Sequence, residues 1–174
     1  HGNPMGLTPN FDRYGRQGTH LFNSITCQPL CGPARSCMQT GRYATQTGCY
    51  RNHIPLGQDA ETMAHLFGKA GYHTGYIGKW HLASNRGRNL PPDRRPARFE
   101  RRPVPPDRRG GYRDVWVAAD ALEHTSGATS GHVYDEDGQR VELEGYRVDA
   151  LTDIAIDRLD RFTEDRPFFL FVSF

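Results

Sequence analysis

The segment Pro167-Phe168-Phe169-Leu170-Phe171-Val172-Ser173-Phe174 is apolar at almost every position. Such a run predicts a strand that is covered on both faces, as the strands of a parallel sheet are. Immediately before it, residues 147–163 carry apolar side chains near helical spacing, at Val148, Leu151, Ile156, Leu159 and Phe162. A helix followed by a strand of this kind is typical of an α/β fold.

The same order of elements occurs earlier in the chain. The segment Gly71-Tyr72-His73-Thr74-Gly75-Tyr76-Ile77-Gly78-Lys79-Trp80-His81 predicts a strand over Tyr72–Trp80. An amphipathic helix over 60–70, through Met63, Leu66 and Phe67, precedes it. A further helix is expected from Pro33 to about Thr40, closed by Gly41. We therefore predict an α/β sandwich with a largely parallel central sheet.

The first part of the chain predicts a short helix over Thr8–Gly18. Pro9 suits its first position, and Phe11 and Tyr14 are expected on its inner face. Residues 19–26 alternate enough to predict a strand or an extended segment.

Composition limits the class of protein. The 174 residues suit one compact domain, and a formal net charge of +2 gives no reason to expect a nucleic-acid partner. No apolar run approaches the roughly 18 residues that span a bilayer, so we expect no membrane contact. The four cysteines lie close together, but no C-x-x-C pair indicates zinc. We expect three of them to be small buried residues: Cys27, Cys37 and Cys49.

Residues 84–113 break the alternation of helices and strands. They hold ten arginines and six prolines, so an interior helix or strand is excluded and a loop or insertion is predicted. This loop is either a solvated basic surface or a cover of the active site that attracts a polyanionic substrate through its arginines. The following segment, 112–143, is rich in aromatic and polar residues and gives no clear assignment beyond a candidate sugar-facing wall.

Two motifs carry candidate chemistry. In Cys31-Gly32-Pro33-Ala34-Arg35, the cysteine lies where the predicted helix begins, and the positive end of the helix dipole favours anions there. Arg35 is four residues further on and falls on the same side of the first turn. Lys79 and His81 are two residues apart on a strand, which predicts that both project from one face while Trp80 points into the packing.

The two motifs resemble those of the type I sulfatases. In that family the cysteine of C-x-P-x-R is oxidised to formylglycine, the catalytic nucleophile, and a Gly-Lys-Trp-His segment contacts the sulfate. The one departure is Gln39, where the family prefers an apolar residue. The resemblance implies an alkaline-phosphatase-like fold, and it implies that residues 1–174 are a fragment of a sulfatase catalytic domain that is incomplete at both ends.

The resemblance also assigns roles to four residues. Cys31 becomes the formylglycine, Arg35 holds its hydroxyl groups, Lys79 binds a sulfate oxygen, and His81 binds the sulfate or the leaving group. One Ca²⁺ ion is implied, with the formylglycine as a ligand and the Asp and Asn ligands outside this chain. A formylglycine-generating or anaerobic sulfatase-maturating enzyme is the implied partner, and a periplasmic or extracellular location follows from the same resemblance.

We therefore expect a sulfuric ester hydrolase that acts on a sulfated carbohydrate. One alternative is a phosphate or phosphonate monoester hydrolase of the same superfamily, which can use the same nucleophile. The other is a non-catalytic module that binds polyanions through the basic loop. Expressed alone, the chain is expected to be inactive and marginally folded, because an exposed apolar strand such as Pro167–Phe174 promotes aggregation.

Overall fold

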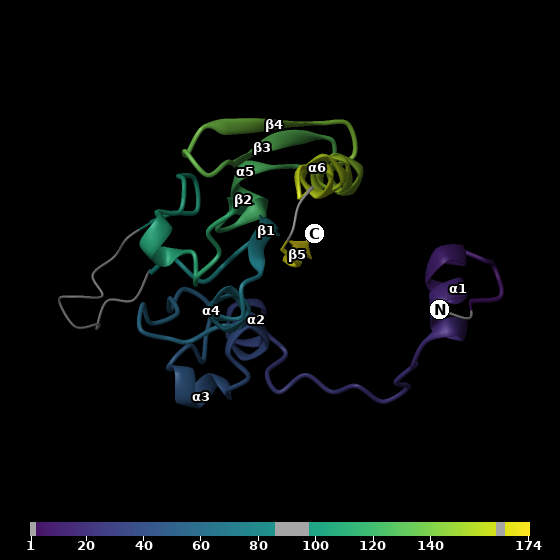
Figure 1. Cartoon of the computed structure of the whole chain (residues 1–174), viewed down its shortest axis with the longest axis horizontal. Helices are drawn as coiled ribbons and strands as arrows, with labels where there is room; N and C mark the ends of the chain where they lie inside the picture. Colours follow the sequence, from purple (N-terminus) through teal and green to yellow (C-terminus); the bar gives the residue numbers. More distant parts are fainter. Residues whose placement is uncertain (1–2, 86–97, 163–165) are drawn as a thin grey trace.

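A computed structural model describes residues 3–85, 98–162 and 166–174, apart from the side chain of Arg161. Its centre is a five-stranded sheet in the order β4-β3-β2-β1-β5, shown in Figure 1. The strands are β1 (His73–Lys79), β2 (Val115–Ala119), β3 (Ser130–Tyr134), β4 (Arg140–Glu144) and β5 (Phe168–Ser173). The pairs β2–β1 and β1–β5 are parallel, whereas β3 and β4 are antiparallel additions. The predicted α/β class with a parallel centre is confirmed.

The described residues form the helices α1 (Pro9–Gln17), α2 (Cys31–Thr40), α3 (Ala44–Thr47), α4 (Met63–Lys69), α5 (Leu122–Thr125) and α6 (Arg147–Arg161), and a 3₁₀ turn, η2 (Pro106–Arg108). Helix α4 contacts β1 and α2, and α6 contacts β1 and β4. Figure 1 shows α2 and α4 together beyond one side of β1, and α6 on the other side beside β2 and β3. Among the described residues, no helix is long and apolar enough to cross a membrane.

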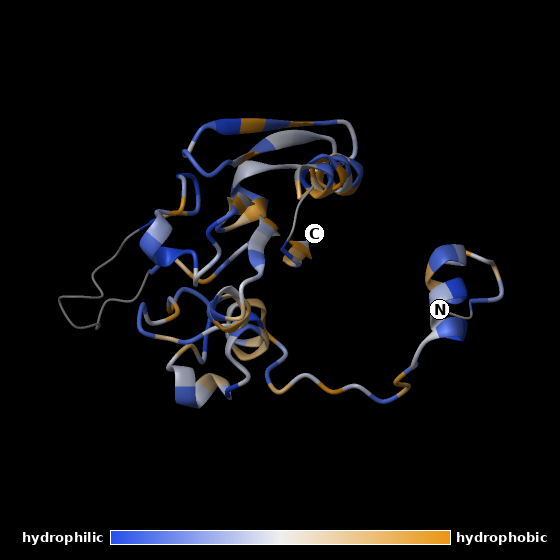
Figure 2. Ribbon diagram, in the orientation of Figure 1, coloured by the Kyte–Doolittle hydropathy of each residue, from blue (hydrophilic) through white to orange (hydrophobic). Residues whose placement is uncertain are grey.

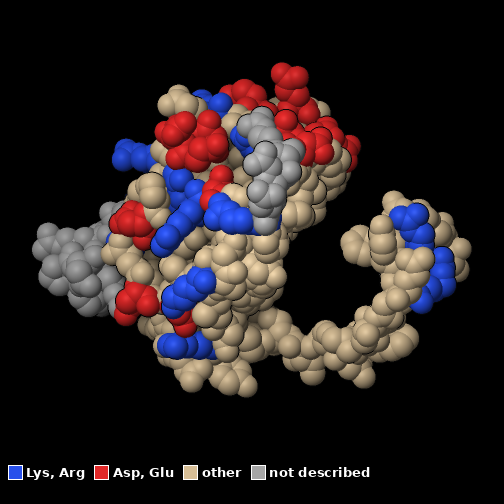
Figure 3. All heavy atoms as spheres, viewed as in Figure 1, with Lys and Arg blue, Asp and Glu red and all other residues tan. Residues whose placement is uncertain are grey.

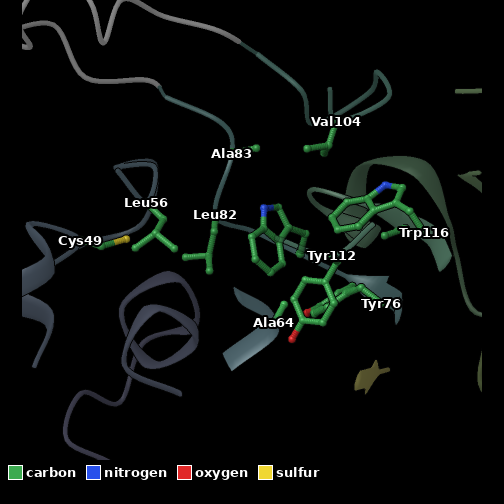
Figure 4. Packing of buried hydrophobic residues seen from close by; sticks show 11 residues of the cluster. Cys49, Leu56, Ala64, Tyr76, Leu82, Ala83, Val104, Tyr112 and Trp116 are labelled. Carbon is green, nitrogen blue, oxygen red and sulfur yellow. The ribbon is translucent and has the colours of Figure 1, made fainter. Parts of the chain in front are cut away.

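Alternation along the strands builds two apolar cores. Tyr76 and Trp116 point into the core on the α4 side, whereas their neighbours Ile77 and Val117 point into the core under α6. This follows from the two-residue period of a strand. Figure 2 shows apolar colouring along β2, β5 and one side of α6, and Figure 4 shows the aromatic rings of the first core in contact.

Strand β5 confirms one prediction and corrects another. It pairs with β1 in parallel, as its apolar run indicated. In the described part of the chain it lies at the edge of the sheet, however, and Phe168 remains 47% exposed. Both faces are nevertheless covered in part, because Phe169 and Phe171 pack against one core and Leu170 and Val172 against the other. Full burial is not reached, since among the described residues only β1 pairs with this strand.

The N-terminal helix forms as predicted, but its environment differs. Thr8 precedes α1 and bonds the Asp12 carboxylate instead of capping a backbone amide. The predicted inner face is wrong, because Phe11 and Tyr14 are 75% and 63% exposed. Figure 1 shows α1 well apart from the sheet, at the end of the exposed segment before α2. Residues 19–26 are extended without a strand.

Strand β2 is the main element that the sequence did not assign. It lies within the segment 112–143, where Val115–Ala119 is a fully buried apolar run of only five residues. Three aromatic residues of this segment, Tyr112, Trp116 and Tyr134, are buried and do not face solvent, whereas His124 is exposed. The sugar-facing wall stays a prediction.

Two of the three cysteines expected to be buried are buried, Cys37 and Cys49, whereas Cys27 is exposed. Cys27 lies in the exposed segment that leads to α2, where no core is available to cover it.

Candidate active site

The two sequence motifs meet where α2 begins and β1 ends. Arg35, in α2, donates hydrogen bonds through Nη1 to the carbonyl oxygen of Lys79 (2.7 Å) and to the hydroxyl oxygen of Tyr76 (3.1 Å). The Tyr76 hydroxyl in turn donates to the same Lys79 carbonyl. Burial raises the pKa of Tyr76 to about 12, so this hydroxyl stays protonated and remains a donor. The arrangement fixes α2 against the carboxyl end of β1, the edge at which open α/β sheets bind ligands.

Cys31 is the first residue of α2 and is exposed. A residue that sequence analysis did not select, Asn52, holds it in place. The Asn52 side chain contacts the Cys31 sulfur through Nδ2 (3.3 Å), and its Oδ1 accepts a hydrogen bond from the amide of Gly32 (2.8 Å). One of the free amides of the first helical turn is thus satisfied from outside the helix, since Leu30 provides no side-chain cap.

Gly32 itself marks a close approach. A Cβ built there would lie 3.0 Å from Asn52 Oδ1 and 3.7 Å from the carbonyl oxygen of His81. The start of α2 therefore lies next to His81, two residues after the end of β1. Only a glycine leaves this contact undisturbed.

Lys79 is nearly buried, and its ammonium group forms an ion pair with Glu123 of α5. The lysine side chain is 10% exposed and the glutamate side chain is 59% exposed. Burial alone would raise the pKa of Glu123, but the Lys79 hydrogen bond and charge outweigh it and lower that pKa. Glu123 is the second site residue that sequence analysis missed, because it follows the unassigned strand β2.

His81 does not continue the strand. Its φ is 59°, in the left-handed region, so the alternation that predicted Lys79 and His81 on one face ends at Trp80. Trp80 is buried as expected. The His81 ring lies against that of His53, which also has a positive φ of 67°, with 5.9 Å between ring centroids. Backbone strain of this kind is most often found at functional sites.

The imidazole of His81 is neutral at ordinary pH. Burial, and then the positive charge of Lys79, lower its pKa to about 4. Its Nδ1 is buried and has no hydrogen-bond partner within the part of the chain that the structure describes. An uncharged imidazole with an unused nitrogen can donate or accept one hydrogen bond at this edge of the sheet.

The four predicted residues thus lie in one region. Cys31 contacts Asn52, Gly32 adjoins His81, Arg35 binds the Lys79 carbonyl, and the charges of Lys79 and Arg35 both act on His81. Gln39, the departure from the family pattern, is buried one turn further along α2 than Arg35, on the same side of the helix, and accepts a hydrogen bond from Tyr112 (2.8 Å). This hydrogen bond links α2 to the segment before β2.

Residues 98–113, which belong to the described part of the arginine-rich segment, include side chains that pack away from the four predicted site residues. Arg109 is buried, donates to the carbonyl oxygens of Val104 and Glu136, and stacks on Trp116. Residues 106–113 line one side of a cavity of about 640 Å³, whose other walls include Trp80 and residues 56–60. None of the four predicted site residues lines it. Residues 86–97, which hold the other part of the predicted loop, lie outside the described residues.

The predicted calcium site is not formed by these residues alone. Across residues 3–85, 98–162 and 166–174, no three His, Cys, Asp or Glu side chains are grouped so that they could hold a metal ion. Calcium binding therefore remains a prediction.

The sulfatase family model matches residues 1–174. The chain belongs to the sulfatase family. Two curated sulfatases are similar over nearly all of it. An ulvan-active sulfatase of Formosa agariphila is 32% identical over 174 residues, covering 99% of this chain and 31% of that protein. An N-acetylglucosamine-6-O-sulfatase of Bacteroides thetaiotaomicron is 30% identical over 168 residues, covering 97% of this chain and 26% of that protein.

Solved structures agree with this family. A chain solved in complex with its substrate D-glucosamine-2-N,6-O-disulfate is 28% identical, with a TM-score of 0.70 over 94% of this chain and 28% of the other. The fold is the predicted alkaline-phosphatase-like one. The chain spans less than a third of the length of these curated relatives.

Proposed function

We propose that this sulfatase hydrolyses a sulfate monoester of a carbohydrate, with a formylglycine made from Cys31 as the nucleophile. The observation that carries the proposal is the hydrogen bond between Arg35 and Lys79, because it joins the C-x-P-x-R helix to the strand that ends in Gly-Lys-Trp-His. Support for a carbohydrate comes from two relatives, which are named N-acetylglucosamine-6-O-sulfatase and ulvan-active sulfatase.

The chain's own residues have separate tasks in this proposal. Arg35 and the start of α2 supply positive potential where a sulfate would bind. Lys79 contributes a cation to a sulfate oxygen, and neutral His81 a hydrogen bond to the sulfate or to the departing oxygen. Hydrated formylglycine supplies two hydroxyl groups at position 31, one that attacks sulfur and one whose deprotonation later expels sulfate and restores the aldehyde. Asn52 orients position 31 through its contact with the Cys31 sulfur and its hydrogen bond from the Gly32 amide.

The described residues on the face seen in Figure 3 do not form a continuous basic surface. On the face seen in Figure 3, lysine and arginine side chains are interspersed with acidic ones, and acidic side chains gather near β4 and α6. A polyanion-binding module usually presents a continuous basic face. Arg109 is also engaged in internal contacts.

The experiment begins with modification. The protein is expressed from its complete reading frame together with a formylglycine-generating enzyme, and the peptide that contains Cys31 is analysed by mass spectrometry. Conversion of the thiol to an aldehyde is expected, and Cys31→Ala should abolish turnover of an aryl sulfate. An unmodified thiol, under conditions that convert a control sulfatase, contradicts the mechanism. Faster turnover of an aryl phosphate than of the sulfate would favour the phosphate monoester alternative instead.

A further inference from the structure

The ion pair between Lys79 and Glu123 has a consequence for an anionic substrate. Glu123 belongs to α5, the short helix that follows β2, and its carboxylate contacts the ammonium group assigned above to a sulfate oxygen. The Lys79 side chain is nearly buried, while most of the Glu123 side chain faces solvent. An anion that reaches Lys79 from solvent therefore meets a fixed negative charge beside the cation.

A carboxylate at this place weakens the binding of every anion, but not equally. The repulsion grows with the charge of the ligand, since Coulomb energy is proportional to the product of the two charges. A sulfate monoester carries one negative charge. A phosphate monoester carries about 1.5 to 2 negative charges at pH 7. The penalty for the phosphate ester is therefore up to about twice that for the sulfate ester.

The other charged and titratable groups near the Lys79 ammonium do not cancel the difference in repulsion between sulfate and phosphate esters. Lys79 and Arg35 are positive, and His81 is held neutral by burial and by Lys79. These groups attract a dianion more than a monoanion, which would favour phosphate. Glu123 is the acidic group whose charge acts on both Lys79 and His81.

We infer that Glu123 is a specificity-determining residue that favours singly charged sulfate esters over doubly charged phosphate esters at the Lys79 site. The inference rests on the proposed function and deepens it, because it states how this sulfatase discriminates between the two ester classes. Glu123 takes no part in bond breaking. It acts by its charge and through Lys79.

The test compares Glu123→Gln with Glu61→Gln in the protein from its complete reading frame. Glu61 forms an exposed ion pair with Lys69 and is the matched control for loss of one glutamate charge. Three substrates with the same aryl leaving group are used: a sulfate ester, a phosphate monoester and a singly charged phosphate diester. Glu123→Gln should raise the ratio of kcat/KM for phosphate monoester over sulfate about tenfold. The ratio of diester to sulfate should stay unchanged, because both carry one charge.

A binding measurement separates this inference from the proposed function. Titration calorimetry with inorganic sulfate and with methyl sulfate requires no turnover. Glu123→Gln should increase the affinity for the doubly charged inorganic sulfate about tenfold more than the affinity for the singly charged methyl sulfate. Glu123→Asp keeps the charge and should keep the wild-type ratios, and thermal unfolding establishes that each variant is folded. If aryl sulfate is not hydrolysed but the calorimetric shift appears, the proposed function fails and the inference stands. Unchanged selectivity in folded Glu123→Gln, or the same shift in Glu61→Gln, overturns the inference.

Discussion

The guanidinium group of Arg35 donates a 2.7 Å hydrogen bond to the carbonyl oxygen of Lys79. The two residues are 44 positions apart and belong to different motifs, so neither motif contains this contact. This hydrogen bond holds the first turn of α2 against the last residue of β1. Because Cys31 lies at that helix start, the geometry around the proposed nucleophile is set by a bond to the backbone of the proposed sulfate-binding lysine.

Replacing Arg35 by lysine should damage both stability and activity. One amine cannot reproduce the planar guanidinium that reaches Tyr76 and Lys79 together. We expect the free energy of unfolding in urea to fall by about 2 kcal/mol and turnover of an aryl sulfate to fall about 100-fold. Arg42→Lys, at an exposed position just after α2, is the control and should change neither. Wild-type stability in Arg35→Lys would show that the contact is not important for the fold.

Asn52→Ala should destabilise the first turn of α2. The variant loses the 2.8 Å bond to the Gly32 amide and the contact with the Cys31 thiol. Loss of such a cap costs about 1 kcal/mol. In protein that has not been converted to the aldehyde, Cys31 should also be alkylated faster, which mass spectrometry can follow over time. Asn23→Ala, in the exposed segment before α2, should leave both quantities unchanged, and an alkylation rate equal to wild type in Asn52→Ala would count against the positioning role.

His81 should remain neutral until the pH falls to about 4. Its ordinary pKa in an unfolded chain is about 6.5, so the unfolded state binds more protons than the folded state between those two values. Its contribution to stability is therefore complete above about pH 6.5 and is lost as the pH falls toward 4. NMR titration of the histidine ring checks the pKa, with His81→Gln identifying its signal. A midpoint near 6.5 in the folded protein would contradict this prediction.

Gly78→Ala should prevent normal pairing of β1 with β5. Gly78 has a φ of 99°, and a Cβ there would lie 1.9 Å from the carbonyl oxygen of Ser173. The backbone of β5 would have to move, so we expect a loss of more than about 3 kcal/mol of unfolding free energy, or insoluble protein. Gly145→Ala is the control, because its φ of 76° is similar but nothing lies within 4 Å of the added Cβ. That variant should lose only about 1–2 kcal/mol, and equal losses in both would show that backbone conformation alone is responsible.

The class of fold and the four candidate residues could be predicted from the amino-acid sequence alone. Apolar runs and helical spacing are local properties, so β1, β5 and α6 could be predicted within a few residues. Strand β2 was not assigned because five apolar residues within a polar and aromatic segment give a weak periodic signal. The chemistry of Cys31, Arg35, Lys79 and His81 was recognisable because each motif is contiguous in the chain.

The other residues of the site, and the charge state of His81, depend on how the elements pack together. Asn52 and Glu123 come from segments without a motif, and they reach Cys31 and Lys79 only after α2 and β2 have packed against β1. The neutral state of His81 likewise results from burial and from the charge of Lys79. Local patterns specify elements and reactive groups, whereas long-range contacts, burial and the resulting electrostatics exist only once those elements have packed together.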